Sequence, residues 1–137
     1  MKFLKVVLRF IITLILLHSP LALSTNLTNK DCKNIAVKIN NLISGLKVDN
    51  ATTGMGVVCL PGPKMVYYYS VDLTILGIVK SQFAMVLSEI KKKSINYWCS
   101  QPKNRELIFK LKSVKYHYIK TNGEYIGEIE ISKHNCN

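Results

Sequence analysis

The 137-residue chain lacks the common motifs of catalysis and metal binding. It contains no Cys-x-x-Cys pair, which argues against a zinc site and a thioredoxin-like redox centre. The Gly-x-Ser-x-Gly nucleophile motif and glycine-rich phosphate loops are also absent. Acidic residues are scarce, and Asp31, Asp49 and Asp72 fall in separate segments rather than forming a carboxylate pair. From these absences we expect no metal, no cofactor and no enzymatic activity.

Long apolar runs are absent except near the N-terminus, where a short one follows a basic start and precedes small residues. This order is typical of a secretory signal peptide, and the run is far shorter than the roughly 20 residues that span a bilayer. Ala22 and Ser24 suit the −3 and −1 positions of a cleavage site, whereas cleavage after Ala22 would place Pro20 at −3. We predict a signal peptide over 1–24 and one exported domain over 25–137. Because Thr25 and not a cysteine comes directly after the cleavage point, we expect no lipid anchor. Because the mature part has no second long apolar segment, we expect no membrane span.

All four cysteines lie in the predicted mature domain, at Cys32, Cys59, Cys99 and Cys136. An even number of cysteines in a small exported domain indicates two disulfides. The count alone leaves three pairings open.

Positive charge dominates the mature part. The predicted signal peptide carries 3 of the 19 basic residues and none of the 8 acidic ones, so the mature net charge is 16 − 8 = +8. This excess indicates anionic partners such as lipid headgroups, nucleic acid or an acidic protein face. A simple solvated lysine-rich surface explains it equally well.

Helical and strand patterns alternate along the mature chain. Apolar spacing predicts two main helices, and Thr28 is placed to cap the first of them. Segments rich in Val, Tyr and Thr predict strands. We therefore expect an α+β fold in which a mainly antiparallel sheet of about four strands carries two main helices on one face. The predicted helices are 25–44, 75–98 and a short 102–110, and the predicted strands are 52–60, 65–71, 114–121 and 124–132.

The last two strands flank Asn122-Gly123, a favoured type I′ hairpin turn. A two-residue turn pairs Thr121 with Glu124 and sets the register of the hairpin. This register places apolar pairs on one face and opposite charges across from each other on the other face. The expected pairs are Tyr118–Gly127, Tyr116–Ile129, Val114–Ile131, His117–Glu128 and Lys115–Glu130.

Two alternative functions rest on particular residues. His117 and His134 could act as the acid–base pair of a small secreted nuclease, whereas His18 falls in the predicted signal peptide. Tyrosines beside basic residues could stack nucleic acid bases, although such residues more often form the core of a sheet, so we do not expect nucleic acid binding. Asn26 and Asn50 begin N-glycosylation tripeptides, which matter only in a eukaryotic cell. The tyrosines concerned are Tyr67, Tyr68, Tyr69, Tyr116 and Tyr118.

The mature domain resembles the disulfide-containing α/β pilotins of type II secretion systems. The resemblance rests on Cys99-Ser100-Gln101-Pro102, Arg105 to Ile108, Val114-Lys115-Tyr116, Asn122-Gly123 and Cys136. The upstream stretches Val48-Asp49, Pro61-Gly62 and Tyr67-Tyr68-Tyr69 also fit exported relatives of this group.

The resemblance implies a bridge between Cys99 and Cys136, which leaves Cys32 to pair with Cys59. It also implies a non-enzymatic binding protein that holds a helical segment of a partner from the envelope or the secreted proteins. It identifies no groove residues. Pilotins are lipoproteins and this chain lacks their lipid-attachment cysteine, so the resemblance implies a binding role without an anchored piloting role. A basic effector that binds anionic surfaces is the third function we consider.

Overall fold

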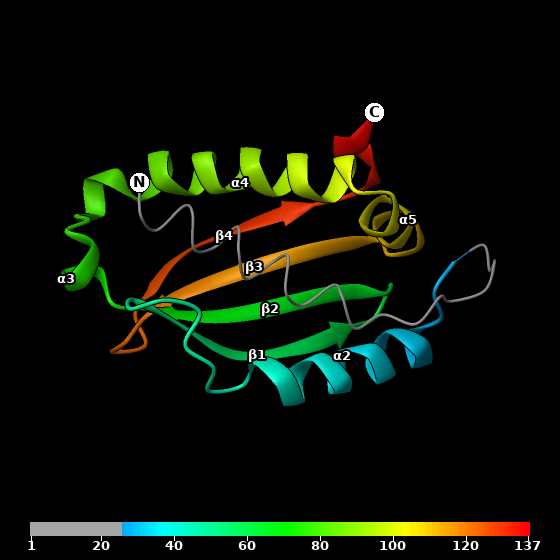
Figure 1. The fold of residues 1–137 in the computed structure, drawn as a ribbon, viewed down its shortest axis with the longest axis horizontal. Coiled ribbons are helices and arrows are strands. Elements are labelled where there is room, and N and C mark those ends of the chain that lie inside the picture. The colour runs from blue at the N-terminus through cyan, green and yellow to red at the C-terminus, as the bar shows by residue number, and fades with distance from the viewer. Residues whose placement is uncertain (1–25) are drawn as a thin grey trace.

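The computed structural model describes residues 26–137, so the predicted signal peptide lies outside the described residues. A four-stranded sheet in the order β1-β2-β3-β4 forms the centre of the domain (Figure 1). β1 with β2 and β3 with β4 are antiparallel, whereas β2 and β3 are parallel. The α+β fold with a mainly antiparallel sheet is therefore confirmed. The elements are α2 (Asn29–Ile43), β1 (Thr52–Leu60), β2 (Lys64–Val71), α3 (Leu73–Leu76), η1 (Lys80–Gln82), α4 (Phe83–Ser100), α5 (Pro102–Lys110), β3 (Ser113–Lys120), β4 (Tyr125–Ile131) and η2 (Lys133–Cys136).

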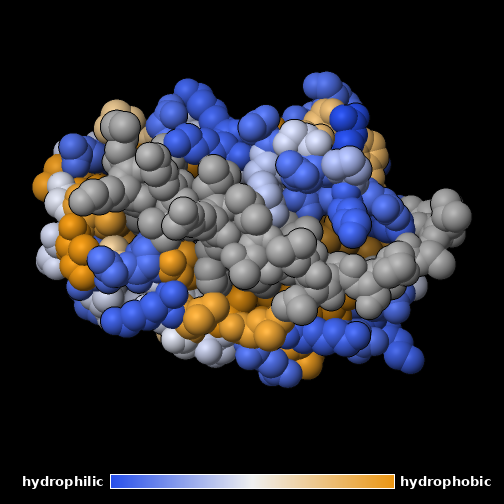
Figure 2. Space-filling model, in the orientation of Figure 1, coloured by the Kyte–Doolittle hydropathy of each residue, from blue (hydrophilic) through white to orange (hydrophobic). Residues whose placement is uncertain are grey.

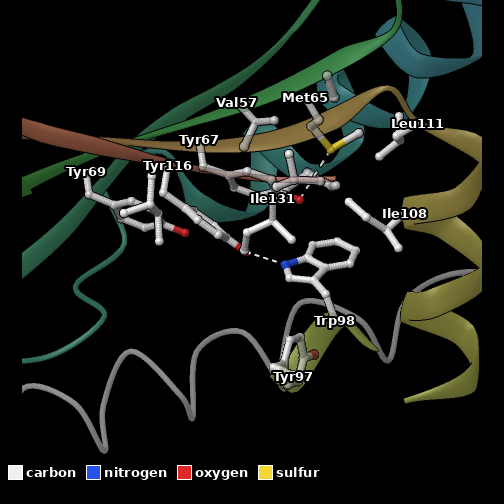
Figure 3. Packing of buried hydrophobic residues seen from close by; sticks show 14 of the residues in the cluster. Val57, Met65, Tyr67, Tyr69, Tyr97, Trp98, Ile108, Leu111, Tyr116 and Ile131 are labelled. Atoms are coloured by element: carbon white, nitrogen blue, oxygen red, sulfur yellow. Dashed lines mark hydrogen bonds between the residues drawn. The ribbon is translucent and has the colours of Figure 1, made fainter. Parts of the chain in front are cut away.

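Both main helices cover the same face of the sheet. α2 runs along β1 and is joined to it by the Cys32–Cys59 disulfide. α4 packs on β4, and its Trp98 donates a hydrogen bond of 2.9 Å to the hydroxyl of Tyr116 (Figure 3). Alternate residues of the strands supply the core on this face. They include Val57, Met65, Tyr67, Tyr69, Val114, Tyr116, Tyr118, Ile129 and Ile131, all of them buried.

The structure forms two disulfides, Cys32–Cys59 and Cys99–Cys136. The second bridge ties the end of α4 to η2, the last element of the chain. This is the pairing that the family resemblance implied. Within residues 26–137, no helix is both long and apolar enough to cross a membrane.

Two predicted helices need correction at their first turns. The first begins at Asn29 rather than at residue 25, because the side chain of Thr28 accepts the N–H of Asp31 and caps the helix there. The predicted helix 75–98 is interrupted, because Gly77 adopts a left-handed conformation with φ +63° and ends α3. A continuous helix then begins only at Phe83.

The turn between β3 and β4 differs from the predicted one. Lys120, not Thr121, pairs with Glu124, and the N–H of Lys120 donates to the carbonyl of Glu124 at 2.7 Å. A type I′ turn needs positive φ at both central residues, but of these two only Gly123 has it. The Asn122 side chain instead accepts the N–H of Glu124. The loop therefore has three residues, and the predicted Thr121–Glu124 pair is wrong.

A bulge in β4 restores the predicted register beyond this turn. Ile119 pairs with Tyr125 and Tyr118 with Gly127, so Ile126 has no residue opposite it. This extra residue offsets the extra residue of the turn. From Tyr118 onward, all five predicted pairs of the hairpin are confirmed.

Candidate functional site: an apolar pocket at one end of the sheet

The segment between β2 and α4 folds into two short turns over the end of the sheet. Asp72 begins α3, because its carboxylate accepts the N–H groups of Thr74 and Ile75 at 3.0 and 3.4 Å. Hydrogen bonds from Thr74 hold the pKa of the Asp72 carboxyl below its usual range. Gly77 then turns the chain, and the side chain of Gln82 accepts the N–H of Val79 at 3.1 Å. The apolar side chains of this segment are thereby directed into two layers, one inward and one outward.

The inward layer surrounds a shallow apolar pocket that is partly open to solvent. Its walls come from α3, the start of α4 and the ends of three strands. All but one of the lining side chains are free of polar atoms, and the exception is a tyrosine. The lining residues are Val71, Leu73, Leu76, Ile78, Phe83, Val86, Leu87, Ile90, Tyr118 and Ile126.

The outward layer leaves large apolar side chains in solvent near this pocket. Ile75, Val79 and Met85 are 56%, 59% and 62% exposed. Ile75 lies in α3, Val79 just before η1 and Met85 in the first turn of α4, all next to the pocket lining. Figure 2 shows hydrophobic residues gathered at the end of the molecule where Figure 1 places α3. We call Ile75, Val79 and Met85 the pocket rim. Exposed apolar residues beside an apolar pocket are typical of a surface that binds another protein.

The charges next to the pocket are nearly balanced. The Lys120 ammonium lies 6.0 Å from the ring centre of Phe83 and pairs with Glu124 at 2.6 Å. This pairing lowers the pKa of the Glu124 carboxyl, and the charge of Lys80 adds to the effect. Because the Lys120 and Glu124 charges are paired with each other, the site favours a ligand that it recognises through apolar contact.

The structure does not bring His117 and His134 together. His117 lies on the sheet face that carries no helix, between the rings of Tyr68 and Tyr125 at 5.2 and 5.1 Å. Its Nδ1 is 3.5 Å from a carboxylate oxygen of Glu128. His134 lies in η2, which packs against the helices of the other face. This arrangement offers no acid–base pair. In the described part of the chain, no three His, Cys, Asp or Glu residues are grouped as metal ligands.

Four of the five tyrosines singled out in the sequence belong to the core. Tyr67, Tyr69, Tyr116 and Tyr118 are buried, and burial raises the pKa of each of their hydroxyls. Rings buried in this way cannot stack on the bases of a nucleic acid. Only Tyr68 points to the opposite face.

Sequence reasoning missed the pocket because residues 73–79 continue the helical spacing of the segment that follows. One signal could have revealed it. Gly77 stands in the middle of an otherwise apolar stretch, and an isolated glycine at such a point often ends a helix. Ending the helix there turns part of its apolar face outward, which creates the pocket rim.

No family model and no curated protein matches the chain. Two solved structures share its fold. One, from Pseudomonas aeruginosa, is described provisionally as a secreted protein. It has a TM-score of 0.60 and 13% sequence identity, and the match covers 83% of this chain and 100% of that protein's chain. The other is EpsS, the pilotin of the type 2 secretion system of Vibrio vulnificus, with a TM-score of 0.57 and 12% identity, covering 80% of this chain and 94% of its own. At these identities the likeness shows the fold alone, and the chain thus has a fold that resembles a pilotin's.

Proposed function

We propose that this chain is an exported, non-enzymatic binding protein that holds an apolar segment of another envelope or secreted protein. The observation that carries the proposal is the apolar pocket with its exposed rim. An amphipathic helix that binds a groove places apolar side chains at a spacing of three or four residues into it. The apolar lining of the pocket and its exposed rim provide the contact surface for such side chains.

Three further features support this proposal. The two disulfides fit an oxidising compartment. The predicted signal peptide 1–24 provides a route to that compartment. The pilotin fold of EpsS belongs to a protein that works in a secretion system, which makes a segment of an envelope protein the partner that we expect.

Site-specific crosslinking in the producing cell tests the proposal. A photoreactive amino acid replaces Val79 in the pocket rim, and in a matched variant it replaces Leu42, which is 48% exposed on α2. We expect a defined protein adduct from position 79 and none from position 42. An Ile75→Asp substitution should abolish the adduct, because it places a charge beside the apolar pocket. Adducts of equal yield at both positions would contradict the proposal.

Affinity measurements make the test quantitative. A synthetic peptide that spans the crosslinked segment should bind the purified protein, and Ile75→Asp should weaken its Kd by at least about tenfold, as expected for a central contact. Leu42→Asp should leave the Kd unchanged. Because both side chains are largely exposed, both variants should keep the wild-type circular dichroism spectrum.

A further inference from the structure

A second surface with its own character runs along the contact between α2 and β1. Its apolar members are Val37, Met55, Val58 and Leu60, which are 60%, 50%, 42% and 44% exposed. Lys33 lies one turn before Val37 on α2, and Lys64 pairs with Leu60 across the β1–β2 hairpin. We call these six residues the α2–β1 seam. The pocket is walled by α3, α4 and strand ends, so the seam is separate from it.

Hydrogen bonds along the whole length of α2 hold it against β1, so the seam spans both sides of this sheet edge. Val37 lies on α2, whereas Val58 and Leu60 alternate with the buried Val57 and point to the face that carries no helix. At one end, the side chain of Asn29 accepts the N–H of Gly62 at 3.0 Å. In the middle, Asn40 accepts the N–H of Val57 at 3.0 Å. Near the other end, the hydroxyl of Ser44 donates to the carbonyl of Met55 at 3.4 Å. Figure 1 shows the result, in which α2 lies beside β1 at the rim of the molecule.

The same contacts restrict what can bind there. Asn40 occupies the backbone N–H of Val57 that an added strand would need. Gly56 permits this approach, because a Cβ at this position would collide with the Asn40 side chain. The first residues of β1 are also covered, since Gly54 exchanges backbone hydrogen bonds with Gly45 and Leu46. A ligand of the seam must therefore bind through side chains and not by extending the sheet.

Positive charge is in excess in the part of the chain that contains the seam, as it is in residues 72–137, where 11 − 6 = +5. Residues 26–71 contain five lysines and two acidic residues, 5 − 2 = +3, and within the described chain none of these lysines forms a salt bridge. Both carboxylates are occupied locally. Asp31 accepts the hydroxyl of Thr28, and Asp49 accepts the N–H groups of Ala51 and Thr52. The ion pairs among the described residues lie instead between positions 89 and 128. The lysines concerned are Lys30, Lys33, Lys38, Lys47 and Lys64.

The composition of the seam favours a lipid surface over a protein. The residues that contribute most to protein interfaces are Trp, Tyr and Arg, and the seam contains none of them. Lysine, which protein interfaces avoid, provides all of its charge. Protruding aliphatic side chains between lysines are instead typical of proteins that lie on a bilayer, where the apolar groups enter the headgroup region and the ammonium groups remain beside the phosphates.

We propose that the α2–β1 seam binds the surface of an anionic lipid bilayer. The lysines supply attraction to the negative headgroups, at about fivefold in affinity for each lysine near the surface. Val37, Met55 and Leu60 supply apolar contact that persists when salt screens the charges. This proposal does not depend on the pocket, which remains free for a protein partner.

Co-sedimentation of the purified exported protein with vesicles tests the proposal. The probes are vesicles of phosphatidylcholine alone and of phosphatidylcholine with about 30% phosphatidylglycerol, a composition that gives a negative surface potential. We expect binding only to the anionic vesicles. Neutralising both seam lysines, in Lys33→Gln with Lys64→Gln, should weaken binding about 30-fold.

A matched pair of substitutions distinguishes the effect of the seam lysines on vesicle binding from the effect of total charge. Lys91→Gln with Lys93→Gln removes the same two charges from α4, where neither lysine forms a salt bridge among the described residues. This pair should weaken binding by less than about threefold, through loss of net charge alone. An equal loss from the two pairs would overturn the proposal, as would absence of binding to anionic vesicles.

The apolar part of the seam has its own readout. In about 0.5 M salt, where the Debye length is only a few ångströms, Val37→Ser with Met55→Ser should abolish the residual vesicle binding of the wild type. Met85→Ser in the pocket rim should not. If soluble polyglutamate binds the seam as tightly as the vesicles and displaces them completely, the ligand is an acidic protein and the bilayer proposal is wrong.

Discussion

Removal of the Cys99–Cys136 disulfide gives the most direct test of how this domain is stabilised. The bridge closes a loop with a sequence separation of 37 residues. In the chain-entropy model, a loop of this length stabilises the folded state by about 3.8 kcal/mol at 25 °C. Small domains have total unfolding free energies of about 5–15 kcal/mol. We therefore expect Cys99→Ala with Cys136→Ala to leave a folded but weakly stable protein.

The second bridge supplies the comparison. Cys32 and Cys59 are separated by 27 residues, so the same model assigns their bridge about 3.6 kcal/mol. The two losses should be nearly equal in global stability but should differ locally. Without its bridge, α2 retains its buried apolar face and the hydrogen bond of Asn40 to β1. Without Cys136, η2 keeps only its packing on α4 and α5, and we expect the last residues to fray.

Urea unfolding followed by circular dichroism measures both effects. With a slope of about 1.5 kcal/mol per molar urea, a loss of 3.8 kcal/mol lowers the midpoint by about 2–3 M. Hydrogen exchange should show lost protection at η2 in the Cys99→Ala, Cys136→Ala variant only. A midpoint that falls by less than about 0.5 M, or four reactive thiols in the folded wild type, would refute this reasoning.

Three further predictions concern the core. Tyr116→Phe removes the acceptor of the buried Trp98 N–H, so it should cost about 1–3 kcal/mol in urea unfolding, and an unchanged midpoint would contradict the hydrogen bond. Gly127→Val should lower the free energy of unfolding by about 1–3 kcal/mol, because a Cβ at this position meets the Leu87 side chain. In a chain that already carries Leu87→Ala, the same substitution should cost less. If Gly127→Val costs the same with Leu87 and with Ala at position 87, the contact is rejected. Burial raises the pKa of the four core tyrosines, so stability should fall as the pH rises above the ordinary tyrosine pKa of about 10. Of the seven tyrosines, 7 − 4 = 3 lie outside this group, so tyrosinate absorbance equivalent to more than three of them before unfolding would contradict the burial of the four.

Local signals in the sequence were sufficient for most of the secondary structure. The predicted strand 52–60 and the predicted helix 102–110 have the same bounds in the structure. In both cases the ends are marked by residues that restrict the backbone, such as the Pro61-Gly62-Pro63 turn after β1 and Pro102 at the start of α5. The hairpin register was also predictable, because its alternation of apolar and charged residues tolerates only one alignment.

Long-range geometry was not predictable in the same way. The parallel pairing of β2 with β3 arises because the chain passes through α3, α4 and α5 before it returns to the sheet. The residue pattern of a strand does not indicate whether it runs parallel or antiparallel to its neighbour. The three-residue turn and the bulge at Ile126 offset each other, so the residues beyond them keep the alignment that a two-residue turn would have produced. Alternation of apolar and charged residues predicts the final alignment of the two strands. It cannot reveal an extra turn residue and an extra strand residue whose effects on the alignment cancel.

The chemistry of a residue depends on its environment, which the sequence does not show. The sequence offered His117 as a catalytic residue and the tyrosines as groups that stack on bases. In the structure, the histidine lies between two rings on the open face and most of the tyrosines are buried. The pocket and the seam, by contrast, consist of ordinary aliphatic residues that no motif marks. Their meaning comes from exposure, which depends on where a helix ends and which sheet edge another helix covers.

The positions of the pocket and the seam determine how the two could act together. The pocket lies beneath α3 and the start of α4, whereas the seam follows α2 along the opposite edge of the sheet. Effects on well-separated sites add in free energy when no element couples them. Ile75→Asp should therefore weaken peptide binding by the same factor with and without anionic vesicles, and Lys33→Gln with Lys64→Gln should leave the peptide Kd unchanged in solution. A peptide Kd that changes when vesicles are added would mean that the two surfaces are coupled, and because binding linkage is reciprocal, vesicle binding would then change by the same factor when the peptide is present.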